Sequence, residues 1–284
     1  MSVAVAESQD DCIIEQLWDQ YTQKDHDAWA TLYRQTLATL PGRMCDEYLH
    51  GLSKLGLPPD RIVRFEELSD VLRKNTGWEY VAVSGFLPTK QFFSLLADRK
   101  FPANRSIRNL QELEYQELPD IFHDVVGHAP LLMDPIMADF MQEFGKAGMA
   151  CDSESKHTML ARLYWFTVEV GLIQRNGSLK AYGTAIASSA KELEFALQSH
   201  SPNRLHFDLE RIFRTPFSMY DLQETYFAID ALSQMLELAN DGFSCVLKAP
   251  EPLPDIEQGR LVETDSVISA GDRSYHLAKL GSCV

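Results

Sequence analysis

The chain of 284 residues carries a formal net charge of −15, with 45% apolar and 24% charged residues. This length suffices for one large domain with a full core, and the composition is ordinary for a globular protein. The acidic balance argues against a nucleic-acid partner, whose phosphates require a basic surface. No stretch is long and apolar enough to cross a membrane, so we expect no membrane association. Five scattered cysteines without a CxxC motif, and no secretory signal, favour the cytoplasm.

Local patterns predict a chain of helices interrupted by short strands. Residues 1–10 are expected to be a flexible lead. The predicted elements of the first half are two helices within residues 25–55 that break at 41–42, a helix at 60–73, a strand at 78–84, a short helix ending at 96 and a strand at 101–109. Those of the second half are helices at 134–146 and 158–173, a strand at 179–187, a helix opened by a capping box at 189–192, a strand at 225–229 and a helix at 231–239 capped by Asp230.

The stretch LPDIFHDVVGHAPLL carries two histidines, His123 and His128, five residues apart. Pro119 fits the first position of a helix, whereas Gly127 and Pro130 are typical stop signals. On a continuous α-helix a five-residue step turns by about 500°, which leaves the two side chains roughly 140° apart. A helix that ends near Gly127 would let the chain bend and bring His128 back towards His123. Such a pair can grip a metal, although nearby histidines also occur as ordinary core or surface residues.

A second stretch, TMLARLYWFTVEVGLI, is apolar almost all round and contains Glu169. A buried carboxylate is costly unless it is paired or bound to a cation. One interpretation is a buried ion pair with Arg162, two turns earlier, but it leaves the histidine pair unexplained. Two imidazoles and one carboxylate form the facial triad of non-haem Fe(II) oxygenases. His123, His128 and Glu169 are therefore candidate ligands of Fe(II).

Three blocks, PDIFHDVVGHAPLL, LARLYWFTVEVGL and KAYGTAIASS, resemble in sequence and order the catalytic domain of the pterin-dependent aromatic amino acid hydroxylases. The similarity extends from about residue 40 to about residue 238. It implies a mainly α fold with small β-sheets (α+β) in a single catalytic domain, which we place at residues 11–248. Residues 249–284 are expected to be a C-terminal tail.

The resemblance implies Fe(II) and a tetrahydropterin, such as tetrahydrobiopterin, as cofactors. Contacts to the pterin then fall on a strand–loop–helix segment and on residues near the metal. These residues are Gly85, Leu87, Phe92, Asp124, Ala161 and Tyr164. Plain core packing is the alternative role for Phe92, Ala161 and Tyr164.

The resemblance also implies residues that hold an aromatic amino acid. Arg108 matches the residue that clamps the substrate carboxylate, a task suited to the planar guanidinium fork, and Asp120 matches the acid that steadies it. Trp165 matches a wall of the substrate pocket, for which core packing is the alternative. Ser188 matches a serine beside the first histidine and the substrate, although it can also serve only to cap a helix.

Val170 and Ala185 depart from the family pattern, which usually has Phe after the ligand glutamate and Gly at the end of YGAG. By the resemblance both positions border the substrate ring, so the ring can shift against the oxidant. We expect an enzyme, a monooxygenase that uses O₂ to hydroxylate phenylalanine to tyrosine. Meta-hydroxylation of phenylalanine and hydroxylation of tryptophan stay open.

Two readings from other classes also stay open. A zinc hydrolase could use the same ligands with a nearby general base, although Asp124 does not have the HExxH spacing. A non-catalytic pterin-binding or amino-acid-binding protein would gain nothing from a buried carboxylate. The family's animal members carry a regulatory domain before the catalytic one and a tetramer-forming helix after it. Neither pattern is found here, so we expect an unregulated monomer.

Overall fold

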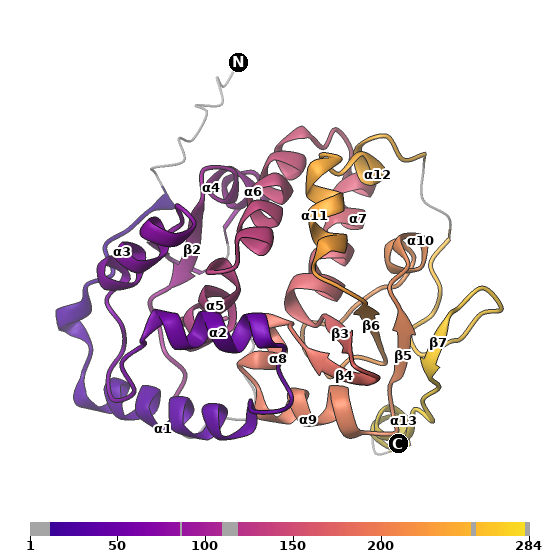
Figure 1. Ribbon diagram of the computed structural model, residues 1–284, viewed down its shortest axis with the longest axis horizontal. Coiled ribbons are helices and arrows are strands. Elements are labelled where there is room, and N and C mark those ends of the chain that lie inside the picture. Colours follow the sequence, from indigo (N-terminus) through magenta and orange to yellow (C-terminus); the bar gives the residue numbers. More distant parts are fainter. Residues whose placement is uncertain (1–11, 86, 110–118, 251–253, 282–284) are drawn as a thin grey trace.

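The structure, a computed structural model, describes residues 12–85, 87–109, 119–250 and 254–281. The lead expected at residues 1–10 lies outside this part of the chain. Helices surround two small sheets, and the predicted mainly α fold with small β-sheets is confirmed (Figure 1). None of the described helices is long and apolar enough to span a membrane.

The helices follow the chain in an order close to that predicted. The α-helices are α1 (Gln23–Thr39), α2 (Asp46–Leu55), α3 (Phe65–Asn75), α4 (Thr89–Ala97), α5 (Ala129–Leu132), α6 (Pro135–Ala150), α7 (Glu154–Tyr164), α8 (Thr184–Ala187), α9 (Ala190–Gln198), α10 (Leu209–Phe213), α11 (Ser233–Asn240), α12 (Ser244–Leu247) and α13 (Ser274–Gly281). A 3₁₀-helix, η2 (Trp18–Gln20), precedes α1. The π-helices η4 (His123–His128) and η5 (Trp165–Glu169) lie near the middle of the sequence.

The strands form two separate sheets. They are β1 (Glu79–Val83), β2 (Lys100–Asn104), β3 (Leu172–Arg175), β4 (Ser178–Ala181), β5 (Asn203–His206), β6 (Thr225–Ile229) and β7 (Val267–Ser269). Strands β1 and β2 pair in parallel and are joined through α4. The larger sheet has the order β4-β3-β6-β5-β7, with a parallel centre and antiparallel edges. Its edge strand β7 comes from the region beyond Lys248, where the patterns predicted no element (Figure 1).

Several predicted boundaries change for identifiable reasons. The helix expected at 158–173 becomes α7, η5 and then strand β3, so Leu172 and Ile173 are sheet residues rather than helix residues. The strand expected at 179–187 ends at Ala181, because Gly183 opens the short helix α8. Asp230 does not cap the following helix, which begins at Ser233. The strand expected at 101–109 is β2, which ends at Asn104.

Arg162 is not the partner of Glu169. Its guanidinium donates to the carboxylate of Asp255, with both N–O distances below 3 Å, and to the carbonyl oxygen of Phe213. These contacts tie α7 to the segment after α12. The ion pair considered for Glu169 is therefore wrong, and the buried carboxylate needs another explanation.

Candidate active site

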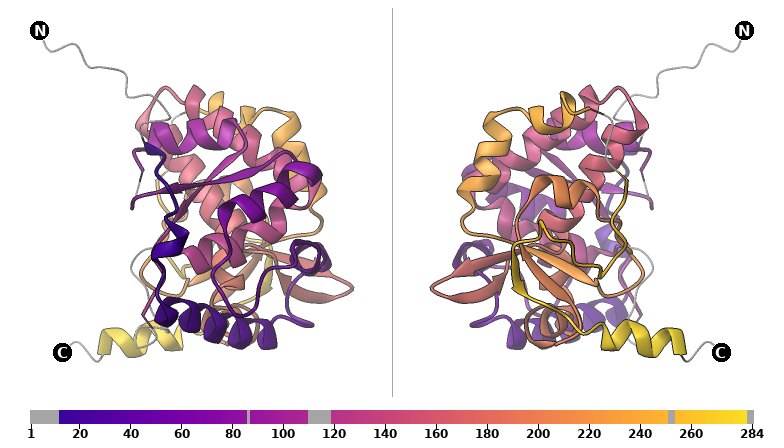
Figure 2. Two further views of the ribbon diagram at one scale, coloured as in Figure 1. Left: turned by 90° about the vertical axis from the view of Figure 1, so that its left-hand side faces the viewer. Right: turned by 90° about the vertical axis from the view of Figure 1, so that its right-hand side faces the viewer.

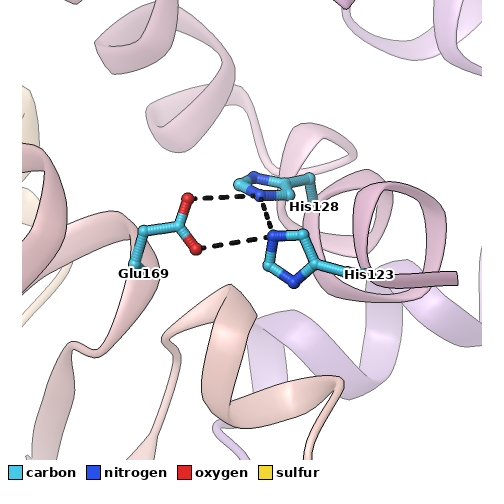
Figure 3. A group of neighbouring side chains, drawn as sticks. All are labelled: His123, His128 and Glu169. Atoms are coloured by element: carbon cyan, nitrogen blue, oxygen red, sulfur yellow. Dashed lines mark hydrogen bonds and ion pairs between the residues drawn. The ribbon is translucent and has the colours of Figure 1, made fainter. Parts of the chain in front are cut away.

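Three predicted ligands converge on one point in the interior (Figure 3). Nε2 of His123 lies 3.2 Å from Nε2 of His128 and 3.6 Å from Oε2 of Glu169. Nε2 of His128 lies 3.4 Å from Oε1 of Glu169. One ligand atom from each residue falls within 4.8 Å of the others. One cation can therefore contact all three, which is the geometry expected of a facial triad.

The two histidines meet because the helix that carries them is a π-helix, not because it ends. Helix η4 runs from His123 to His128 and continues into α5. Its i→i+5 hydrogen bonds place residues five apart about one turn from each other. The predicted end at Gly127 is therefore wrong. Gly127 instead permits close packing, because a Cβ there would lie 2.7 Å from the carbonyl oxygen of Thr184.

A side chain from far along the sequence stabilises this continuous helix. Pro130 has no N–H, so it cannot donate to the carbonyl of Val126, which lies four residues earlier. The hydroxyl of Tyr48, on α2, donates to that carbonyl at 2.7 Å and is fully buried. Helix α2 comes this close because Gly51 has no side chain, and a Cβ there would overlap the carbonyl oxygen of Pro130. These contacts from α2 thus offset the effect of Pro130, which was predicted to stop the helix.

Glu169 ends the second π-helix, in which the N–H of Val170 donates to the carbonyl of Trp165, five residues back. Gly183 lets helix α8 approach, because a Cβ there would lie 2.5 Å from the carbonyl oxygen of Glu169. As a result the hydroxyl of Thr184 donates to Oε2 of Glu169 at 2.9 Å. The same hydroxyl lies 3.2 Å from Nε2 of His128. The uncharged hydroxyl of Thr184 therefore orients the Glu169 carboxylate together with the two imidazoles.

The charge states at this point suit a divalent cation. Burial opposes ionisation of Glu169, but the two histidines and the Thr184 hydroxyl outweigh it and hold its pKa at about 2. Burial lowers the pKa of His123 to about 4. At neutral pH Glu169 is therefore an anion and His123 is a neutral imidazole, and these are the forms that bind metal. The Oγ atom of Ser188 lies 2.9 Å from Nδ1 of His123, and this contact orients the ring so that Nε2 faces the centre.

Arg108 and Asp120 form a buried, bidentate ion pair beside this centre. Nε and Nη2 of Arg108 donate to the two carboxylate oxygens at 2.9 and 2.7 Å, and the backbone N–H of Arg108 also donates to Asp120. The Asp120 side chain is fully buried. Burial opposes its ionisation, but Arg108 outweighs burial and lowers the pKa of Asp120. Since Asp120 also accepts from the backbone N–H of His123 at 3.0 Å, it links the arginine to the first ligand.

A cavity of about 570 Å³ opens onto the centre, within the roughly 300–1,000 Å³ typical of ligand pockets. It is lined by most of the residues that the sequence pointed to. These are Gly85, Leu87, Phe92, Arg108, His123, Asp124, His128, Ala161, Tyr164, Trp165, Glu169, Ala185 and Ser188. Asp120 lies behind Arg108, and Val170 is fully buried and is not among the lining residues.

The lining of the cavity contains two pairs of aromatic rings. In the first pair Phe92 meets Tyr164 edge to face at 6.1 Å between ring centroids. Nearby, Asp124 accepts from the backbone N–H of Asn104 at 2.7 Å, and burial raises its pKa well above the usual value. In the second pair Trp165 stacks on Phe217, with centroids 4.7 Å apart.

Several residues that contact the ligands or line the cavity were not among the predicted site residues. The Thr184 hydroxyl contacts two ligands, while Glu192, Phe217, Tyr275 and Lys279 line the cavity. Thr184 lies in the block KAYGTAIASS, where this chain reads YGTA instead of the family's YGAG, so its hydroxyl was the available signal. The other four come from segments whose position over the cavity depends on tertiary packing.

A buried His₂Glu centre under a ligand-sized cavity is typical of a catalytic metal site rather than a structural one, and non-haem Fe(II) oxygenases are one class that uses it. Residues 14–250 match the family described as biopterin-dependent aromatic amino acid hydroxylase. The chain belongs to this family, and it is an enzyme of the pterin-dependent monooxygenase class.

Named relatives agree with this assignment. The chain is 44% identical to phenylalanine-4-hydroxylase of Ralstonia nicotianae over 93% of this chain and 84% of the relative. It is 42% identical to the enzyme of the same name from Caulobacter vibrioides, over 94% and 91%. The crystal structure of Chromobacterium violaceum phenylalanine hydroxylase with bound iron(III) and 7,8-dihydrobiopterin matches with a TM-score of 0.85 and 39% identity, covering 93% of this chain and 95% of that one.

Proposed function

We propose that this enzyme hydroxylates L-phenylalanine to tyrosine with O₂, using Fe(II) and a tetrahydropterin such as tetrahydrobiopterin. The convergence of His123, His128 and Glu169 at the base of the cavity carries the proposal. The names of the relatives support phenylalanine and the para position. The burial of Val170 away from the cavity lining also favours ordinary ring placement over a shifted ring. Family membership favours iron and pterin over the zinc hydrolase and the non-catalytic binder.

The residues divide into a metal part, a pterin part and an amino-acid part. His123, His128 and Glu169 fit Fe(II), because two imidazole nitrogens and a carboxylate already point at one spot. We assign the side of the cavity formed by Gly85, Leu87, Phe92, Asp124, Ala161 and Tyr164 to the pterin. When bound, iron and pterin supply O₂ activation and the two electrons that ring hydroxylation consumes.

The amino-acid part positions the substrate between the charged guanidinium of Arg108 and the aromatic ring of Trp165. Asp120 holds the Arg108 guanidinium in one plane, ready to pair with a carboxylate. Trp165, stacked on Phe217, offers a flat apolar wall for the ring, and Ala185 and Ser188 close the pocket near the ligands. The mostly apolar surroundings exclude water, which protects the oxidising chemistry from side reactions.

Product analysis tests this proposal. Purified protein would receive Fe(II), tetrahydrobiopterin, O₂ and, in separate reactions, phenylalanine, tyrosine and tryptophan. We expect para-tyrosine from phenylalanine as the main product when products are separated against isomeric standards. Meta-tyrosine would overturn the ring position, a hydroxytryptophan would overturn the substrate, and turnover with zinc alone would overturn the class.

Thr184 offers a further prediction about the metal part. Because its hydroxyl donates to Oε2 of Glu169, Thr184→Val should lower the affinity for Fe(II) by about 10- to 100-fold, the usual cost of losing a hydrogen bond to a ligand. Thr184→Ser keeps the hydroxyl and should bind nearly as the parent does. Anaerobic titration against a chelator measures both affinities. Equal affinities for the valine and serine variants would show that the hydroxyl does not steady the ligand.

We further propose that the chain acts as a monomer in the cytoplasm. Few large apolar side chains are exposed in the described part of the chain. They are Met149, Met219, Tyr220, Leu261, Val267, Leu277 and Leu280. Sedimentation at micromolar concentration should give the mass of a single chain.

A further inference from the structure

Helix α13 is docked on the loop that forms the outer wall of the cavity. This loop, residues 214–224, connects α10 to β6 and has no regular secondary structure. The ammonium of Lys279 donates to Oδ1 of Asp221 at 2.8 Å, and the hydroxyl of Tyr275 donates to the same atom at 3.0 Å. Nε2 of His276 lies 2.7 Å from the carbonyl oxygen of Leu222. Three side chains of one short helix therefore hold two adjacent loop residues.

The position of the helix is itself fixed from the side of the sheet. Arg273, just before α13, donates to Glu224 at 2.6 Å, and the N–H of Tyr275 donates to the hydroxyl of Ser201 at 3.1 Å. The Tyr275 ring also meets Phe195 of α9 at 5.2 Å between centroids. Beyond these contacts the helix points away from the body, and its last turn is exposed (Figure 2).

The same loop supports the aromatic wall. Phe217, four residues before Asp221, stacks on Trp165 with an interplanar angle of 12°. Trp165 begins η5, the π-helix that ends with Glu169. Phe217, Asp221, Tyr275 and Lys279 all line the cavity together with Trp165. The chain of contacts therefore runs from α13 through the loop to the aromatic wall near the ligand set.

We propose that Asp221, Tyr275 and Lys279 are positioning residues for the amino-acid substrate. Helix α13 fixes the 214–224 loop and thereby the Phe217–Trp165 wall against which the substrate ring lies. The helix lies outside residues 14–250, which match the family, so part of the substrate selectivity is set beyond the matched region. This inference rests on the proposed function, because it assigns the Trp165 side of the cavity to the amino acid.

The arrangement predicts an uneven effect on the two organic ligands. The pterin side is built by Phe92 and Tyr164, which belong to α4 and α7 rather than to the loop. Loosening the loop should therefore raise KM for phenylalanine and leave KM for the pterin unchanged. A purely structural role for α13 would change thermal stability or both constants together.

The test is the double variant Tyr275→Phe/Lys279→Met in the full chain. It keeps the ring against Phe195 and the aliphatic stem of the lysine, and removes the two donors to Asp221 together with the cation–π contact between Lys279 and the Tyr275 ring. We expect KM for phenylalanine to rise about fivefold, well below the roughly 100-fold cost of an ångström shift at the reacting atoms. We expect kcat and KM for tetrahydrobiopterin to stay within about twofold, since the ligand set is untouched.

Two matched variants complete the experiment. Leu280→Ala changes the exposed side of the same helix and should leave all constants unchanged. Lys279→Arg keeps a donor and should stay close to the parent. Hydrogen exchange in residues 217–224, measured without ligands, should be faster in the double variant. Hydrogen exchange tests the role of α13 separately from the proposed function, because the exchange rate does not depend on which substrate is hydroxylated. An unchanged KM for phenylalanine, or an unchanged exchange rate, would overturn the inference.

Discussion

Replacing His123 by alanine is expected to abolish hydroxylation while leaving the fold intact. The imidazole supplies one of three ligand atoms, and its side chain lies on the cavity wall, 15% exposed, rather than in the packed core. Loss of an outer hydrogen-bond partner already costs about 10- to 100-fold in metal affinity or activity, so loss of a ligand should exceed 100-fold. Turnover of phenylalanine and iron content after reconstitution measure the effect.

Metal-dependent stabilisation gives a readout that does not need turnover. A ligand that binds only the folded state raises stability by about 2.7 kcal/mol at 100 times its Kd. Anaerobic Fe(II) should therefore raise the Tm of the parent and leave that of His123→Ala unchanged. His50→Ala, which removes an exposed histidine from α2, serves as the control and should behave as the parent does. A variant at His123 that still binds iron and turns over would refute the ligand assignment.

The chemistry of the site could be predicted from the sequence better than its geometry. The expected ligands and most of the expected pocket residues do surround one cavity, because they lie in contiguous blocks whose residue types are distinctive. His123 and His128 meet as predicted, but a helix end near Gly127 is not the cause. A π-helix replaced the expected helix end, and its Val126 carbonyl accepts a hydrogen bond from the hydroxyl of Tyr48, 78 residues away in the sequence. Local patterns of glycine and proline carry no information about such a partner.

The same limit explains the other differences. Arg162 was considered as an alternative partner of Glu169 because both lie in one apolar stretch, yet its partner Asp255 is 93 residues away. Strand β7 is three residues long and belongs to a sheet only because β5 leaves an edge to pair with. Strand β6 was predicted with its observed bounds, since five consecutive buried residues form a continuous pattern. Contacts between distant segments, rather than local propensity, decide the elements that were missed.

Replacing Arg108 by lysine is expected to weaken binding of the amino acid by about 100-fold, equivalent to about 2.8 kcal/mol. Lysine keeps the positive charge beside the buried carboxylate of Asp120, so the fold should tolerate the change better than a neutral residue. It loses the planar fork, which pairs with Asp120 through two parallel hydrogen bonds and orients the remaining N–H groups. Charge-assisted hydrogen bonds are worth about 1.5–3 kcal/mol each, so the expected loss corresponds to one or two of them.

The measurement is KM for phenylalanine alongside Fe(II) affinity and KM for the pterin. Only the first should change, because Arg108 contacts neither the ligand atoms nor Phe92 and Tyr164 in the described contacts. Arg105→Lys makes the same substitution three residues away on an exposed side chain and should leave KM unchanged. If Arg108→Lys lowers iron affinity as much as it raises KM, the arginine acts through Asp120 on the start of the His123 helix instead. Equal KM values in the parent and in Arg108→Lys would remove Arg108 from the substrate site altogether.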